Sequence, residues 1–272
     1  MKYKELGRFT GALSLMWLGG YGLLWALHES GLMASLPGRL NYSFTFLLLG
    51  GMVLFSAINA AKARPSLKEG AIVGVPGILL LVLASGWAPL ELAPAFGVGL
   101  IMLLTGTWIT ASLGREVVSA TYIWPLILVV TAFDLWSVLS SHGVTQKMVV
   151  AFEAGPALLN VMVLTVPIPA IGLKPVLGIG DALFLGFIAG AVDYLQLEWR
   201  RFILGVALGF GTCLLALLAL EVPVPALVFI APWVGICLGR SVATTPKEVL
   251  AAGVFASSLL GVQFLLENQA HW

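Results

Sequence analysis

The chain has 272 residues, of which 60% are hydrophobic and 10% are charged, and its formal net charge is +1. Soluble domains carry about 25% charged residues, so this composition excludes a soluble globular protein, and the high hydrophobicity excludes disorder. The near-zero net charge argues against a nucleic-acid partner. We therefore expect an integral membrane protein whose surroundings are the lipid bilayer.

Apolar stretches of about 20 residues, the length that crosses a membrane, recur along the whole chain. In chain order they are 9–28, 42–61, 70–88, 92–112, 118–140, 176–195, 201–220, 223–239 and 248–266. The stretch 141–174 is interrupted by prolines, and we interpret it as a long connection that can hold a re-entrant or surface segment. The pattern predicts an all-α, polytopic membrane protein of about nine transmembrane helices.

Lysine and arginine concentrate on the cytoplasmic side of membrane proteins. If the N-terminus is cytoplasmic, the nine predicted spans leave only Arg39, Lys147 and Lys174 on the outer side. All other basic residues then face the cytoplasm. We therefore expect a multi-pass protein with a cytoplasmic N-terminus and, after nine spans, an outer C-terminus.

The chain contains only three aspartates, Asp134, Asp181 and Asp193, and all three fall inside predicted spans. An aspartate near the centre of a membrane helix costs roughly 2.5–3.5 kcal/mol on insertion scales, so such a residue usually has a function or a partner. Asp193 lies near the cytoplasmic end of its span, close to Arg200 and Arg201. We expect Asp193 to be an ion-paired residue at the end of its helix.

Asp134 and Asp181 lie at matched depths in two consecutive spans that run in opposite directions. Asp134 is six residues from the outer end of its predicted span and Asp181 is five, so each should lie roughly 8–9 Å below the same surface. Two carboxyls at close range share a proton, which gives one general base and one general acid. This is the arrangement that an aspartyl protease needs, and a proton or cation pathway is the alternative use of membrane acids.

Glycines surround the second aspartate in the run Gly178-Ile179-Gly180-Asp181. Glycine lets another backbone approach closely and permits a local break in a helix. An extended substrate strand would need such access at the point where its peptide bond is attacked. Gly178 and Gly180 are therefore candidate active-site residues.

Three motifs in order resemble those of the presenilin and signal peptide peptidase family. They are Phe133-Asp134, in which phenylalanine replaces the family's tyrosine, the GxGD run that ends at Asp181, and Pro225-Ala226-Leu227. The resemblance covers about 118–240. It implies a presenilin-like bundle in which Asp134 and Asp181 are the catalytic pair.

The resemblance also implies roles for the flanking residues and for the rest of the chain. Phe133, Gly178, Gly180, Pro225, Ala226 and Leu227 would shape the active site and hold the substrate. The substrate would be a transmembrane helix of another protein or a remnant signal peptide. No metal or organic cofactor is implied.

We expect residues 1–117 to be an N-terminal scaffold, 118–240 to be catalytic, and 241–272 to form a C-terminal helix. The family has five spans before its first aspartate and none after its PAL helix, whereas the pattern here predicts four and one. With a cytoplasmic N-terminus, the Asp134 helix runs from inside to outside, which is similar to the signal peptide peptidases. Substrates of type II orientation are then expected.

Two alternatives stay open at this point. A proton- or cation-coupled transporter would also use buried aspartates. A prepilin peptidase also has a GxGD aspartate, although the Phe133-Asp134 and PAL elements fit it less well. The sequence has neither the HExxH pattern of zinc proteases nor the GxSxG nucleophile elbow of serine hydrolases.

Overall fold

The computed structural model describes residues 3–85, 92–139, 163–220 and 225–239, together with parts of 245–261. The chain divides into two compact units, which we call unit 1 and unit 2. Unit 1 comprises Met1–Glu116 and Ala151–Asp193, and unit 2 comprises Val117–Val150 and Tyr194–Trp272. This division cuts across the expected catalytic segment 118–240, because the Asp181 helix groups with the N-terminal helices.

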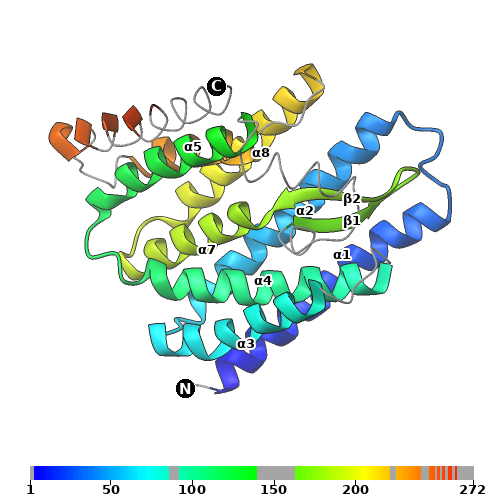
Figure 1. Ribbon diagram of the computed structural model, residues 1–272, viewed down its shortest axis with the longest axis horizontal. Coiled ribbons are helices and arrows are strands. Elements are labelled where there is room, and N and C mark those ends of the chain that lie inside the picture. Colours follow the sequence, from blue (N-terminus) through cyan, green and yellow to red (C-terminus); the bar gives the residue numbers. More distant parts are fainter. Residues whose placement is uncertain are drawn as a thin grey trace, which may run out of the picture. The chain divides into compact units, whose positions relative to one another are not determined.

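The described chain is mostly helical, as the sequence predicted (Figure 1). Unit 1 contains helices α1 (Tyr3–Glu29), α2 (Gly38–Lys62), α3 (Leu67–Ser85), α4 (Leu92–Gly114) and α7 (Ile179–Tyr194), with strands β1 (Val163–Ile168) and β2 (Gly172–Gly178). Unit 2 contains the 3-10 turn η1 (Ala120–Tyr122) and helices α5 (Ile123–Leu139), α8 (Trp199–Leu220) and α9 (Ala226–Leu238).

Within the described residues, five helices are long and apolar enough to cross a membrane. They are Leu6–Glu29, Gly38–Lys62, Ala95–Gly114, Ala120–Ser137 and Trp199–Ala219, and the shorter Ala226–Leu238 is also apolar. These helices support a membrane protein, but they are five rather than the expected nine. Most of the predicted span 248–266 lies outside the described residues.

The helix that carries Asp181 begins later than expected. The sequence predicted a span over 176–195, whereas α7 starts at Ile179 and has 16 residues. At 1.5 Å per residue its length is about 24 Å, which is less than the ~30 Å hydrocarbon core. The difference arises because residues 176–178 continue strand β2. Asp181 is therefore in the first turn of its helix rather than five residues inside it.

An antiparallel β-hairpin begins within the predicted connection 141–174 and continues to Gly178. Strands β1 and β2 pair from Val163 with Gly178 to Ile168 with Gly172. Two residues at the turn have positive φ, Ala170 (63°) and Gly172 (101°). The register shifts between Leu164 and Thr165, beside the pairing of Thr165 with proline 175, which has no N–H to donate.

Small residues bring α7 against α4 within unit 1. A Cβ added to Gly190 would overlap the carbonyl of Ala111, and one added to Gly186 would overlap Thr110 and crowd the backbone of Thr107. Such glycines let two helix backbones approach closely in a membrane protein. The hydroxyls of Ser56 and Thr107, 2.8 Å apart, link α2 to the same helix α4. Helix α4 therefore fixes the rotation of α7 and the direction in which Asp181 leaves it.

Unit 2 places α9 against both α5 and α8. Gly205 and Gly209 of α8 lie against the backbone of Val234 and Ile230 in α9. A Cβ added to Gly235 of α9 would come within 2.9 Å of ring atoms on α5. These contacts hold α9, whose first residues carry part of the PAL motif, against the helix that carries Asp134.

Candidate active site

Asp134 lies on α5, five residues before the last residue of that helix. Its Oδ2 atom accepts a hydrogen bond from the backbone N–H of Leu227 at 2.9 Å. Leu227 is the second residue of α9, and the N-cap of α9 is Pro225. The first N–H groups of a helix have no partner within it, and proline has no side-chain acceptor to satisfy them. The Asp134 carboxylate therefore caps α9 from another helix, where the helix dipole favours a negative charge.

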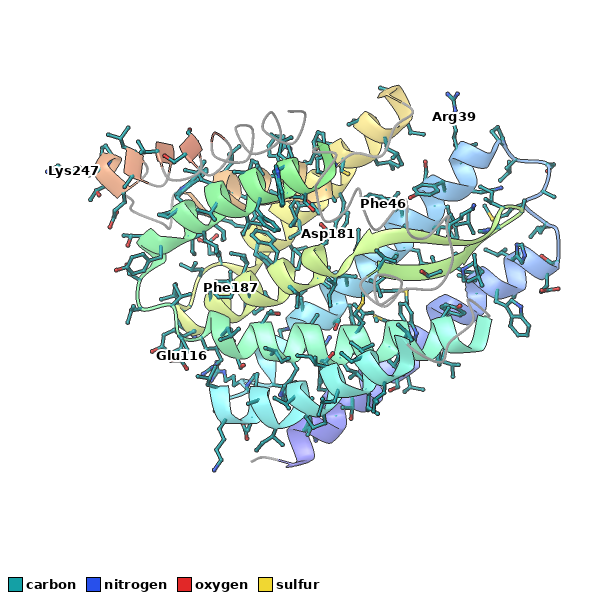
Figure 2. All side chains as sticks on the ribbon, in the orientation of Figure 1. Arg39, Phe46, Glu116, Asp181, Phe187 and Lys247 are labelled. Carbon is teal, nitrogen blue, oxygen red and sulfur yellow. The ribbon has the colours of Figure 1, made fainter. Side chains whose placement is uncertain are left out.

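Asp181 occupies the equivalent electrostatic position on its own helix. It is the third residue of α7, and its Oδ2 atom accepts the backbone N–H of Gly178 at 3.1 Å. This is the bond from the third helical residue back to the N-cap that forms half of a capping box. The residue is 7% exposed. Figure 2 shows Asp181 where β2 ends and α7 begins, with Phe187 further along the same helix.

The two glycines of the GxGD motif differ in their surroundings. A Cβ added to Gly178 would lie 3.6 Å from the Asp181 carboxylate, which is ordinary contact. One added to Gly180 would meet no atom of the described residues within 4 Å, and Gly180 is exposed. Within the part of the chain that the structure describes, the position beside Gly180 is therefore open.

The PAL residues and Phe133 differ in their exposure to solvent. Pro225, Ala226 and Leu227 are buried at the start of α9. Phe133 is 49% exposed, and its ring lies 5.6 Å from that of Trp136, centroid to centroid. The structure thus joins Asp134 to the PAL motif and Asp181 to Gly178, whereas the Phe133 ring contacts Trp136 of its own helix. The two aspartates belong to different units, so the distance between their carboxyls stays a prediction.

Asp193 is ion-paired, as expected, but with partners that the sequence did not indicate. Its Oδ2 atom lies 3.0 Å from Nε of Arg64 and 3.0 Å from Nη1 of Arg115. Arg201, one of the expected partners, pairs instead with Glu198 at 2.6 Å. Asp193 therefore joins the ends of α2 and α4 to the end of α7, twelve residues and roughly 18 Å along the helix from Asp181.

Comparison with protein-family models, with curated proteins and with solved structures returned no match. Among the described residues, no group of three His, Cys, Asp or Glu side chains is placed to hold a metal ion.

Proposed function

We propose that this chain is an intramembrane aspartyl endopeptidase that cleaves transmembrane helices or remnant signal peptides within the bilayer. The observation that carries the proposal is the hydrogen bond between the Asp134 carboxylate and the Leu227 amide. It joins the Phe133-Asp134 motif to the PAL motif, although the two bonded residues are 93 positions apart in the sequence.

Asp134 and Asp181 supply the chemistry in this proposal. The ionised carboxylate removes a proton from a water molecule, whose oxygen attacks the carbonyl carbon of the scissile peptide. The protonated carboxyl gives its proton to the carbonyl oxygen. When the C–N bond breaks, the leaving nitrogen takes up the proton that came from the water. No metal or organic cofactor takes part.

The backbone amides at Leu227 and Gly178 support this use of the two acids. Each amide holds one oxygen of a carboxylate in a fixed position. Fixed acids cost less reorganisation during the reaction than mobile ones. The exposed, open position of Gly180 next to Asp181 supports access by an extended substrate.

We further propose a presenilin-like bundle of about nine spans with a cytoplasmic N-terminus. Charges within unit 1 support this orientation. Arg64 and Arg115 follow the C-terminal ends of α2 and α4, and Lys68 lies at the start of α3, whereas Arg39 is at the other end of α2. In Figure 2, Arg39 and Glu116 lie at opposite ends of unit 1. Asp134 would then lie nearer the outer face, in the sense of the signal peptide peptidases.

The decisive experiment uses purified protein in lipid with a transmembrane model peptide. Asp134→Asn and Asp181→Asn should each abolish cleavage, because an amide cannot exchange the proton that the mechanism requires. The asparagine oxygen can still accept the Leu227 or Gly178 N–H, so both variants should stay folded. Asp193→Asn is the matched control and should still cleave wherever the protein is folded. Cleavage by either of the first two variants would refute the proposal.

If the chain is a proton-coupled transporter instead, we expect proton flux and no cleavage of the peptide. The protein in liposomes with an enclosed pH indicator would carry protons, lose that flux in the two asparagine variants, and leave the peptide intact. Orientation is tested separately with tagged type I and type II substrates. Preferential cleavage of type I substrates would contradict the proposed orientation while leaving the aspartyl chemistry intact.

A further inference from the structure

Thr131 is a half-buried polar residue on α5. Its Oγ1 atom is shielded from solvent and has no hydrogen-bond partner among the residues that the structure describes. Thr131 lies three residues before Asp134, so the two side chains share one side of the helix. The unpartnered hydroxyl therefore lies beside the carboxylate that binds Leu227.

The other threonines in the described part of the α-helices behave differently. Each of the six others donates its hydroxyl to a backbone carbonyl of its own helix: Thr10, Thr45, Thr105, Thr107, Thr110 and Thr212. That bond is the usual way for a helical threonine to satisfy its hydroxyl away from water. Thr131 does not make it, so its hydroxyl is directed at something other than its own backbone.

Buried polar groups in native proteins are almost always hydrogen-bonded to protein, to an ordered water or to a ligand. A water molecule next to Thr131 needs at least two polar partners. The Asp134 carboxylate supplies the second partner, because a carboxylate has about four acceptor sites and the backbone amides of Leu227 and Val228 occupy two of them.

We propose that Thr131 is a positioning residue that holds the attacking water against Asp134. This inference rests on the proposed protease function and assigns Asp134 the role of base. The Thr131 hydroxyl fixes the water oxygen, Asp134 takes one of its protons, and the oxygen forms a bond to the carbonyl carbon. Asp181 then protonates the carbonyl oxygen, and the C–N bond breaks as Asp134 returns the proton to the nitrogen.

Trp136 provides a contrast on the same helix. Its Nε1 atom is also buried without a partner among the described residues. It is two residues from Asp134, which corresponds to about 200° of rotation and places it on the other side of α5. Thr131 is therefore the buried, unpartnered group that can share a water with Asp134.

The test compares Thr131→Val, which removes the hydroxyl at constant shape, with Thr131→Ser, which keeps it. Because the water loses one of its two anchors, kcat for the model peptide should fall roughly 100-fold in Thr131→Val, with KM unchanged. Thr131→Ser should restore most of kcat. The matched control in unit 2 is Thr212→Val, whose hydroxyl is bonded to Leu208 and Gly209 of its own helix, and its kcat should equal that of the wild type.

A second measurement does not depend on activity. If the Thr131 hydroxyl binds a water, Thr131→Val loses that bond and its melting temperature falls. If the hydroxyl has no partner at all, the same substitution removes an unsatisfied polar group and the melting temperature rises. A rise, or an unchanged kcat in a folded Thr131→Val protein, would overturn this inference. If Asp134→Asn and Asp181→Asn still abolish cleavage, the protease proposal stands even where the Thr131 inference is overturned.

Discussion

The carboxylate of Asp134 and the amide of Leu227 are hydrogen-bonded at 2.9 Å, although the two residues are 93 positions apart. The contact gives Asp134 a structural role, because it caps a helix whose own N-cap is a proline. It also gives the PAL motif a definite physical function, which is to present the first amides of α9 to an acid. The structural and chemical roles of this carboxylate can be separated by substitution.

Replacement of Asp134 by alanine should lower stability, whereas replacement by asparagine should not. Alanine removes the acceptor for the Leu227 amide, and loss of a helix cap typically costs about 1 kcal/mol and up to ~2. Asparagine keeps an oxygen in the same place. Thermal unfolding of the two purified variants in the same detergent measures the difference. Equal melting temperatures would show that the contact does not stabilise α9.

The ion pairs of Asp193 predict an order of effects. The Arg115 side chain is 22% exposed and that of Arg64 is 59% exposed, so Arg115 is the less hydrated partner. Arg115→Gln should therefore lower the free energy of unfolding more than Arg64→Gln does. For Arg64→Gln the expected loss is about 1 kcal/mol or less, which is typical of a surface ion pair. Asp193→Ala leaves Arg115 without its buried partner and should cost roughly 3 kcal/mol.

Equilibrium unfolding in detergent measures these three variants. The hydrophobic contacts of α7 are unchanged in all of them, so differences report on the ion pairs. A larger loss for Arg64→Gln than for Arg115→Gln would contradict the assignment of Arg115 as the stronger partner.

Two glycines of α7 should respond in opposite ways to alanine. Gly190→Ala would drive a methyl group into the backbone of Ala111, so α7 and α4 must separate and the folded yield should fall sharply. Gly180→Ala meets open space and should fold normally. If the open space admits a substrate backbone, Gly180→Ala should nevertheless raise KM for the model peptide. Both yields are measured by size-exclusion chromatography, and a well-folded Gly190→Ala protein would contradict the close helix contact.

Membrane orientation can be tested with single cysteines at the two ends of unit 1. With native Cys213 and Cys237 replaced by alanine, Arg39→Cys should react with a membrane-impermeant maleimide in intact cells. Lys68→Cys should react only after lysis, because the proposed topology places it in the cytoplasm. The reverse pattern would put the N-terminus outside and would predict type I substrates instead.

The helical, membrane-embedded character of the chain could be predicted from its apolar stretches, because a membrane-spanning helix is recognised from the composition of a single stretch. The hairpin did not, although Val163–Ile168 is rich in β-formers. Pro167 and Pro175 concealed it, and proline is tolerated there because each strand of a two-stranded sheet is also an edge. The prediction that 176–178 begin a helix was wrong for the same reason.

The candidate site could also be predicted only in part from the sequence. The GxGD motif was expected inside a span over 176–195, whereas the structure places Gly178 at the end of β2 and Asp181 in the first turn of α7. The partners of Asp193 could not be found from the sequence. Arg200 and Arg201 are close in sequence, whereas Arg64 and Arg115 reach Asp193 only because α2, α4 and α7 end together in three dimensions. Tertiary pairing of this kind leaves no local signal.

The bond from Gly178 to Asp181 has a consequence for the hairpin itself. An amide has a single proton, and the one on Gly178 is given to the carboxylate at the last pair of the β1–β2 ladder. The end of strand β2 and the acid of α7 are therefore linked directly through the backbone of Gly178. A substitution that shifts the end of β2 therefore moves the donor that holds one oxygen of Asp181.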